Sequence, residues 1–419
     1  MAKGKGKGKK GTQECEFTVE VEALHKGLDR CHQLLNTDGI PIQDQKLAFR
    51  TDMRDDTLVL CGGYQGTYVE VDVPCEVTTK GYFVTNIAIP WLNYGSAKVS
   101  MKYNAAKRCI EYKGRIKGTF VTTGKFETIM ESQPKKQKPT LKLPFAALHE
   151  VVSTVFFNAS VLEEQEDVLI LLECTELAKP KKTKGKKIKR KAKDKEPDAT
   201  HELIATVFDR ARAAVVKEYC TASKAMDQVS FGSGHLWTFL TKCTSDERKG
   251  DIAITINEDF CVLQTPNCIS VTPSIENELG DMTKQFLSHY KDEDALFSFE
   301  LDTDEHSAPV VSVLSVRGGP RTKLSTGSDE TASDVALSLQ KGKITLSVRG
   351  EVGSGKVTFK PLSSSGSGKI ILKGTFLVEA MELVSPAKAQ FTVWSKMVRQ
   401  VAVGRHYAHH YFATVKDRS

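Results

Sequence analysis

The sequence predicts an α+β protein built from three consecutive domains of similar fold. One series of strands and amphipathic helices recurs three times along the 419 residues. Phenylalanines at equivalent places in the series, Phe83, Phe231 and Phe376, lie 148 and 145 residues apart. Solenoid repeats recur at roughly 20–50 residues, so a period this long indicates whole domains. We expect each domain to pack two helices on an antiparallel sheet of about eight strands.

Each copy opens with a short strand and a helix. The strands are predicted at 16–21, 140–143 and 296–301, where apolar and polar residues alternate. The helix of the third copy is expected at 308–316, with Pro309 near its start, where a missing N–H costs little. The other two helices are marked by apolar residues at spacings of three and four, namely Leu24, Leu28, Cys31 and Leu35, then Phe145, Leu148, Val152, Val155 and Phe156.

A run of three strands follows in each copy, and most of them alternate as half-buried strands do. They are predicted at 46–51, 57–60 and 67–73, at 167–173, 201–208 and 213–219, and at 334–340, 343–349 and 356–362. A strand, a short helix and two further strands are expected to close each copy. Trp91, Trp237 and Trp394 fall in or beside this closing segment, where core packing is the default expectation for tryptophan.

The stretch 350–359, GEVGSGKVTF, comes within one residue of the phosphate-binding pattern G-x-x-x-x-G-K-[ST], because Val357 stands where a hydroxyl is required. A phosphate loop of this kind must lead into a helix whose N-terminus meets the phosphate. Here residues 356–360 alternate as a strand does, and no helical pattern follows before Pro361. We therefore interpret the stretch as a hairpin turn of the third domain, for which glycines are well suited.

The net charge of +7 is unevenly distributed. Sixteen of the 59 basic residues and one of the 52 acidic residues lie in two segments, 3–10 and 179–195, so the rest of the chain holds 43 basic and 51 acidic residues. Two interpretations of the basic segments stay open. They are solvated segments that aid solubility, or they are non-specific tethers to nucleic-acid phosphates. The second interpretation would use Lys186, Lys187, Lys189 and Arg190.

Changes in composition place the domain boundaries. Residues 1–13 are expected to form a basic disordered tail, and the domains to span 14–135, 136–280 and 281–419. The second domain carries a basic insertion at 178–199, at a hairpin tip where added length is tolerated. No apolar run approaches the ~20 residues that span a bilayer, and the N-terminus lacks the apolar core of a secretory signal. Neither membrane insertion nor secretion is expected.

Catalytic residues do not occur in any familiar arrangement. The sequence contains no G-x-S-x-G or H-E-x-x-H motif. Its ten cysteines include no C-x-x-C pair and are interpreted as reduced core thiols of an intracellular protein. His406, His409 and His410 come nearest to a metal site, but they lie on an alternating strand with no cysteine or carboxylate nearby in sequence. We expect no enzyme activity, no cofactor and no metal.

The order of elements resembles that of the bacterial DNA sliding clamp, the beta subunit of DNA polymerase III, which uses a two-helix domain three times per chain. Residues 16–35, EFTVEVEALHKGLDRCHQLL, are similar to that family's opening strand and helix, and 54–74, RDDTLVLCGGYQGTYVEVDVP, to its first hairpin. VFDRARAA is similar to the family's T-D-x-x-R-L-A segment through Asp209, Arg212 and Ala214. The basic tail and insertion are not family features and suggest a divergent member, in keeping with a bacteriophage source.

The resemblance implies a processivity factor without chemistry of its own. Two chains would close head to tail into a homodimeric ring of six domains, with sheets outside and helices lining a hole that encloses duplex DNA of any sequence. Residues near the helices would contact phosphates, although an ordinary solvated role stays open for each. The candidates are Lys26, Arg30, Lys242, Arg317 and Arg321. Such a ring would act at the replication fork in the cytoplasm, that of the host if the protein is viral.

The resemblance further implies a pocket between the second and third domains that receives short peptides of DNA polymerases and the clamp loader. The positions carried over to this sequence are Phe208, Arg212, Ala213, Pro273, Ile275, Tyr411 and Phe412. The chain end departs from the family, which closes with an apolar strand, whereas this chain reads HHYFATVKDRS. The partner motif is therefore expected to differ.

Two alternative functions stay open at this stage. A basic protein that binds nucleic acid through its lysine-rich segments, without forming a ring, would have the same charge distribution. A nucleotide-dependent enzyme built on 350–357 would belong to a different class, and the strand pattern after Lys356 argues against it.

Overall fold

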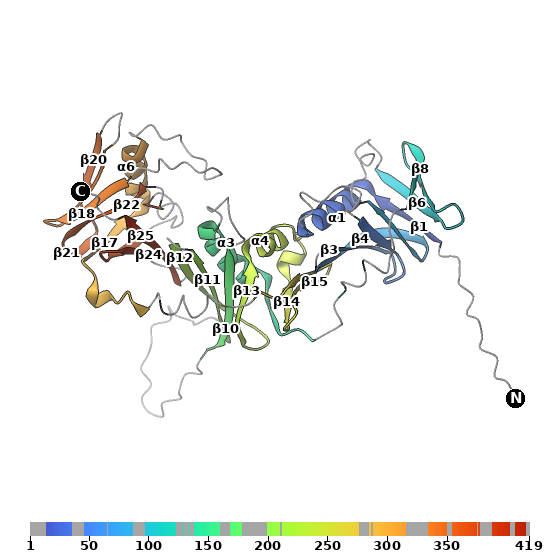
Figure 1. The fold of residues 1–419 in the computed structure, drawn as a ribbon, viewed down its shortest axis with the longest axis horizontal. Coiled ribbons are helices and arrows are strands. Elements are labelled where there is room, and N and C mark those ends of the chain that lie inside the picture. The colour runs from blue at the N-terminus through green and yellow to red at the C-terminus, as the bar shows by residue number, and fades with distance from the viewer. Residues whose placement is uncertain are drawn as a thin grey trace, which may run out of the picture. The chain divides into compact units, whose positions relative to one another are not determined.

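The computed structural model describes residues 14–35, 46–64, 66–86, 97–122, 129, 133, 138–159, 168–177, 199–209, 212–275, 285, 288–315, 334–349, 354–374, 376–377, 388–402 and 407–415. The chain divides into two compact units. The first comprises Met1–Lys142 and Thr238–Ser274, and the second comprises Leu143–Trp237 and Ile275–Ser419. Strands of antiparallel sheets make up more than half of the described residues, and helices make up far fewer (Figure 1).

The first series opens in the predicted order, with a strand, a helix and a run of three strands. It consists of β1 (Cys15–Glu20), α1 (Val21–Leu34), β2 (Lys46–Arg50), β3 (Thr57–Tyr64), β4 (Thr67–Thr79), β5 (Tyr82–Asn86), β6 (Lys98–Asn104), β7 (Cys109–Lys113) and β8 (Lys117–Val121). The predicted apolar face of α1 is confirmed, because Leu24, Leu28 and Cys31 are all buried. This face packs on β3 and β4, which places the helix across the sheet (Figure 1).

The second series repeats this order. It consists of β9 (Leu141–Pro144), α3 (Phe145–Ala159), β10 (Leu169–Glu176), β11 (His201–Asp209), β12 (Arg212–Cys220), β13 (Met226–Gly232), α4 (Ser233–Thr241), the short 3-10 helix η2 (Glu247–Lys249), β14 (Asp251–Ile256), β15 (Phe260–Thr265) and β16 (Cys268–Pro273). Helix α3 begins directly after Pro144 and packs on β11 and β12. The predicted short second helix is α4.

The third series follows a 3-10 turn, η3 (Asp292–Asp294). It consists of β17 (Phe297–Asp302), α6 (Thr303–Ser315), β18 (Asp334–Gln340), β19 (Lys343–Arg349), β20 (Ser354–Phe359), β21 (Ser363–Gly366), β22 (Gly368–Lys373), β23 (Lys388–Val393), β24 (Met397–Ala402) and β25 (Tyr407–Val415). Three similar series on antiparallel sheet confirm the predicted α+β class. The boundaries 14–135, 136–280 and 281–419 stay a prediction, since compactness groups 238–274 with the first series.

Two details of the prediction were wrong. Helix α6 begins at Thr303 and not at 308, so Pro309 lies inside it. The start is set by Asp302, whose carboxylate accepts a hydrogen bond from the Glu305 N–H at 3.3 Å and so satisfies a free donor of the first turn. Each series also closes with three strands after its second-helix segment, not two. In the first and third copies the segments expected to hold that helix lie largely outside the described residues.

The stretch GEVGSGKVTF is confirmed as part of an antiparallel hairpin. Strand β20 begins at Ser354 and pairs with β19, with Arg349 opposite Ser354 and Leu346 opposite Val357. Residues 350–353 lie outside the described residues. Lys356 and Val357 therefore stand in a strand, where a phosphate loop would require the first turn of a helix.

The cysteines pack as core residues. All ten are free thiols, nine of them buried and Cys109 partly so. Burial raises the pKa of Cys15 to about 11 and that of Cys268 to about 12, because a thiolate loses its hydration in these sites. These thiols are therefore protonated and poor nucleophiles near neutral pH.

Strand pairing also joins successive copies. In the first unit, β4 pairs antiparallel with β16, with Val71 opposite Cys268. In the second unit, β12 pairs antiparallel with β25, with Ala213 opposite Tyr411. In both cases the fourth strand of one copy meets the last strand of the next copy, so one rule connects the first copy to the second and the second to the third.

The same rule leaves two strands without a partner on one side. Strand β8, the last of the first copy, pairs only with β7 and ends its sheet. Strand β20, the fourth of the third copy, pairs only with β19 and ends the other sheet. Within the described ranges, these strands present free hydrogen-bonding edges of the types that are paired at β16 and β12.

Candidate partner-binding site and basic residues

A row of side chains crosses the strands that join the second and third copies. Strand register places Phe208 of β11 beside Ala213 of β12, and Ala213 beside Tyr411 of β25. The row continues from Tyr411 to Arg399 of β24. Residues paired in antiparallel strands project from the same face, so this row brings side chains of both copies onto one face of the sheet.

An apolar cluster lies on this face, at the end of the row. Its buried members are Ala213, Trp394, Met397 and Tyr411, and Phe208, Tyr290 and Ala295 pack against them partly exposed. Ala213 is 0% exposed although it carries only a methyl group. The cluster therefore has a buried apolar base and a rim of the partly exposed aromatic residues Phe208 and Tyr290. This composition is typical of a site that receives an apolar side chain of a partner.

Polar contacts fix the rim. The indole N–H of Trp394 donates a hydrogen bond to the Lys291 carbonyl at 2.8 Å. The Tyr290 ring meets the Trp394 ring edge-on, with the centroids 5.5 Å apart. These contacts hold the segment around Tyr290 against the hairpin of β23 and β24. An aromatic pair oriented in this way presents a preorganised surface.

Arg399 also holds Trp394 in place, because its guanidinium lies over the face of the indole ring. Its guanidinium lies 5.4 Å from the Trp394 ring centroid and forms an ion pair with Asp292 at 2.7 Å. The same Nη2 atom donates to the Thr392 hydroxyl at 3.1 Å. A cation over an aromatic face, held by a carboxylate, restricts the ring to one position. The positive charge of Arg399 is thus used within the chain.

The predicted pocket residues divide between several places. Phe208, Ala213 and Tyr411 meet in the cluster. Arg212 lies opposite Phe412 in β12 and β25, and its side chain is outside the described residues. Phe412 does not belong to the cluster: it follows Tyr411 in a strand, projects from the other face, and lies in the core of the third copy.

The two linker positions do not join the cluster either. Pro273 is the last residue of β16, in the first unit, and is exposed. Ile275 is 37% exposed and forms an isolated bridge to Ser230 of β13. The sheet order places β10 and β11 between β13 and β12, which separates Ile275 from Ala213 by several strands.

The sequence selects three of the seven cluster residues, Phe208, Ala213 and Tyr411. It assigns Trp394 to core packing and gives no indication of Tyr290, Ala295 or Met397. Trp394 stands at the turn between two predicted strands. A tryptophan at a turn lies at the edge of the sheet and not over its middle, where the core residues pack. That position was an available signal. The partnership with Tyr290, about a hundred residues away, needed the tertiary structure.

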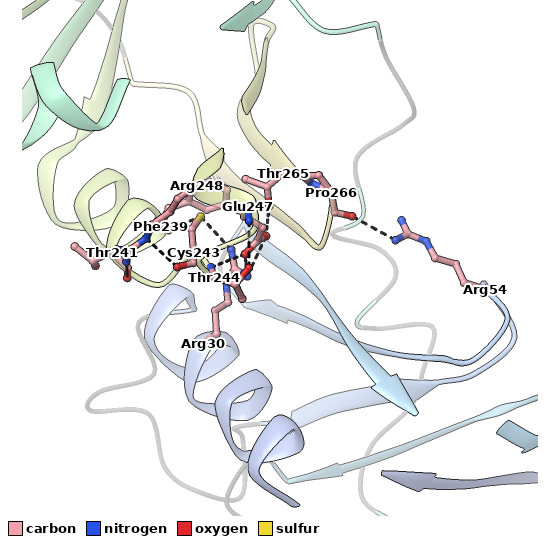
Figure 2. A network of polar contacts seen from close by, with 10 residues as sticks. All are labelled: Arg30, Arg54, Phe239, Thr241, Cys243, Thr244, Glu247, Arg248, Thr265 and Pro266. Carbon is pink, nitrogen blue, oxygen red and sulfur yellow. Dashed lines mark hydrogen bonds and ion pairs between the residues drawn. The ribbon is translucent and has the colours of Figure 1, made fainter. Parts of the chain in front are cut away.

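Arg30 is not available to DNA, contrary to the prediction. It is 5% exposed and forms a buried ion pair with Glu247, from Nη1 to both carboxylate oxygens at 3.2 and 2.9 Å. Figure 2 shows the side chain leaving α1 toward the segment that contains η2. Its Nη2 also donates to the Cys243 sulfur at 3.3 Å. The guanidinium joins the first and second copies within the first unit.

Glu247 is held ionised by its neighbours. Burial by itself would raise the pKa of this carboxyl, but the Arg30 guanidinium, the Thr265 hydroxyl and the Thr244 N–H outweigh burial and keep the pKa below its usual value. Arg248 extends the network by donating to the carbonyls of Thr241 and Cys243 at 2.7 and 3.1 Å, after the end of α4 (Figure 2). Such contacts satisfy carbonyls left free at a helix end.

The other basic candidates have different environments. Lys242 is half-exposed and lies 3.1 Å from Asp29 of α1, so it supports the same junction as Arg30. Lys26 is 73% exposed and pairs with Glu22 one turn earlier, at 2.6 Å. Arg317, Arg321, Lys186, Lys187, Lys189 and Arg190 lie outside the described residues.

Neither a metal centre nor a membrane-spanning helix occurs among the described residues. No three or more histidine, cysteine, aspartate and glutamate side chains come together there in a way that could hold a metal ion. His409 and His410 project from opposite faces of β25, and His406 lies outside the described residues. No described helix combines the length and apolar character needed to cross a bilayer.

The three series, their joining strands and the cluster together define the fold of a bacterial DNA sliding clamp. The DNA polymerase sliding clamp of Bacillus subtilis matches with a TM-score of 0.72 at 12% identity, over 96% of this chain and 99% of that chain. The DNA polymerase beta subunit of Streptococcus pyogenes matches with 0.70 at 12%, over 96% and 100%. The DNA polymerase III beta subunit of Thermotoga maritima matches with 0.70 at 12%, over 96% and 99%.

Sequence comparison alone does not reach this result. No protein-family model matches the chain, and no curated protein matches it. The chain thus has the clamp fold over nearly its whole length, although only about one residue in eight is identical to that of a solved clamp. The predicted resemblance to a divergent member is confirmed at the level of fold.

The buried pair of Arg30 and Glu247 gives a first prediction. Replacing Arg30 by Met leaves a buried carboxylate without its partner, which costs on the order of 3–5 kcal/mol. We expect a fall in the unfolding temperature of the first unit, measured by calorimetry. The double variant Arg30→Met/Glu247→Leu should recover most of the loss. The control Lys26→Met, which breaks an exposed pair on the same helix, should leave the temperature unchanged.

The buried His410 gives a prediction about pH. The ring is 2% exposed, opposite Ala214 in β12, and burial lowers its pKa to about 4. Above the unfolded pKa of about 6.5 the ring is neutral in both states and contributes nothing to pH dependence. As pH falls from there toward 4, only the unfolded state gains the proton, so stability falls by about 1.4 kcal/mol per unit.

The measurement is urea unfolding of the wild type and of His410→Gln at several pH values between 4 and 6.5. The variant should show a shallower loss of stability with acidity, by the amount assigned to one histidine. His289→Gln, at an exposed position, serves as the matched control. Equal slopes for wild type and His410→Gln would contradict the assignment.

Proposed function

We propose that this protein is a DNA sliding clamp, a processivity factor that encircles duplex DNA and tethers replication proteins without catalysing a reaction. The support is the fold, shared with solved clamps over 96% of the chain. The single observation that carries the ring is the pairing rule of the strands. The fourth strand of a copy pairs with the last strand of the next copy at both internal junctions.

Ring closure follows if the rule holds once more between two chains. The free edges are β20 of the third copy and β8 of the first copy. Pairing β20 of one molecule with β8 of another would be head to tail, and two such contacts close a homodimer. Both strands carry an exposed lysine, Lys356 on β20 and Lys117 on β8, a common safeguard against uncontrolled edge pairing.

The contacts to DNA are proposed to be phosphate-directed and independent of sequence. Lys26 and Lys242 stay candidates, each now with an acidic neighbour that lowers its net attraction. Arg317 and Arg321 stay candidates by position alone, as do Lys186, Lys187, Lys189 and Arg190 of the insertion. A ring holds DNA by enclosure, so few strong contacts are needed and an acidic chain body is tolerated. We place this activity at the replication fork in the cytoplasm.

The apolar cluster is proposed to receive short peptides of a DNA polymerase and a clamp loader. It combines side chains of the second and third copies, as the family pocket does, through Phe208, Ala213 and Tyr411. The resemblance implies that Tyr411 and Phe412 of the chain end line the pocket. Trp394 and Met397 lie in the cluster with Tyr411 instead of Phe412. The expected anchor of the peptide is one large apolar side chain seated against the rim of Phe208 and Tyr290.

The ring is tested through its edges. Val121 of β8 is 70% exposed, so Val121→Glu should not disturb the fold but should repel a strand that approaches this edge. Light scattering after size exclusion should show a two-chain mass for the wild type and a one-chain mass for the variant. Met53→Glu, at another exposed apolar position, should keep the two-chain mass. A wild-type monomer at high protein concentration would contradict the ring.

Enclosure of DNA separates the clamp from the alternative of a lysine-rich tether. A chain lacking 1–13 and 179–195 is loaded on a nicked circular duplex and then passed over a sizing column. A clamp stays with the circle and leaves once the circle is linearised, whatever the salt concentration. A tether loses all binding with the two deletions, and that result would sink the ring proposal.

The docking site is tested with peptides selected from a random library displayed on phage. Selected peptides should carry a large apolar residue, and Phe208→Ala should weaken their binding by about tenfold or more, as expected for a rim contact worth about 1.4 kcal/mol. Tyr219→Ala, an exposed aromatic on β12 outside the cluster, is the matched control. Equal losses in both variants would place the peptide elsewhere.

A further inference from the structure

The sheet of the third copy has one covered face and one open face. Its strands lie in the order β22, β18, β19, β20, and α6 packs against β19 and β20. Residues that face the helix side are buried and apolar, among them Leu337, Leu346 and Leu372. The alternate residues of the same strands point the other way and form what we call the outer face.

The outer face is rich in lysine and hydroxyl groups. Its exposed lysines are Lys343, Lys356, Lys360, Lys369 and Lys373. Strand register aligns Lys369, Ser338, Thr345 and Thr358 in one row across the four strands, and Ala336, Ser347 and Lys356 in the next. Asp334 is the one acidic residue among the described strand positions of this face.

None of these five lysines forms an ion pair among the described residues. No described carboxylate lies within ion-pair distance of any of the five. By contrast, Lys80, Lys98, Lys102 and Lys107 of the first unit each have a carboxylate oxygen within 4 Å. With Asp334, which stands opposite Lys373 in the strand register, as its one described carboxylate, the outer face keeps a net positive charge that a bound anion would neutralise.

The chemistry of the face favours nucleic acid over a protein. Protein interfaces need an apolar centre, and the apolar residues of this face are small or half-buried, as Ala336 and Ile371 are. Hydroxyls are suited to phosphate oxygens. The hydroxyls of Thr345 and Thr358 share one hydrogen bond at 3.1 Å, which leaves one of the two protons free to donate. Among the described residues of the face, no exposed aromatic side chain is available to stack on bases, so a duplex backbone is favoured over a single strand.

We propose that the outer face of β22, β18, β19 and β20 is a second nucleic-acid surface, which binds the phosphate backbone of duplex DNA without reading its sequence. Four strands at about 4.8 Å spacing give a width of roughly 15 Å, close to that of a groove with its flanking backbones. Helix α6 stands on the opposite side of this sheet. A second duplex segment, or DNA leaving the ring, would thus be held outside the enclosed one.

The test is the salt dependence of binding to a linear 24-base-pair duplex, followed by fluorescence anisotropy on the full chain. The variant Lys343→Gln/Lys356→Gln/Lys369→Gln/Lys373→Gln should lower the slope of log K against log salt by up to about 3.6, or 0.9 for each lost phosphate contact. The corresponding Lys→Arg variant should restore the slope, since it keeps the charge.

The matched control is Lys80→Gln/Lys98→Gln/Lys102→Gln/Lys107→Gln, which removes the same net charge from paired lysines. It should leave the slope within one unit of the wild type. Equal slopes for the two glutamine variants would overturn the proposal, as would polyglutamate displacing the duplex at equal charge concentration. Retention on circular DNA is measured separately. Either proposal, the outer face or the ring, can therefore be contradicted without affecting the other.

Discussion

Unpaired strand edges are the constraint on which the rest of this structure depends. Each copy has a fourth strand and a last strand whose backbone groups need partners, and an unpaired edge is a liability in water. Pairing β4 with β16 and β12 with β25 satisfies one edge of each kind at two junctions. In a chain of three copies, one fourth strand (β20) and one last strand (β8) remain unpaired on one side. The same pairing requirement that joins the copies within the chain is the basis of the proposed association between chains.

Charge in the first unit is used mainly for assembly of the chain. Arg30 and Lys242 look from the sequence like residues for phosphate, yet each is paired with a carboxylate at the junction of two copies. A buried arginine is tolerated there because Glu247 is itself held by Thr244 and Thr265. On the outer face of the third copy's sheet, by contrast, five exposed lysines stand without an ion pair among the described residues. The positive charge that a surface offers to an anion therefore depends on which basic residues are ion-paired, and not only on how many there are.

The apolar cluster depends on the same junction. Ala213 and Tyr411 belong to different copies and meet only because β12 and β25 pair in one register. A shift by one residue would bring Phe412 to this face and send Tyr411 into the core of the third copy. Trp394 and Arg399 then fix the rim through Lys291 and Asp292 of the preceding segment. The proposed docking site and the cohesion of the chain thus rest on one set of backbone hydrogen bonds.

The sequence by itself determined the local elements, because alternation and helical spacing are properties of neighbouring residues. It predicted the threefold series, most strand positions and the hairpin at 350–359, whereas the grouping of Phe208, Ala213 and Tyr411 came from the family resemblance. The start of α6 escaped it because an aspartate cap outweighed a proline signal. Only the tertiary structure decided that Arg30 is buried, that Phe412 lies in a core, and that Trp394 faces Tyr290. Those outcomes depend on which strands pair across tens to hundreds of residues, and no local pattern carries that information.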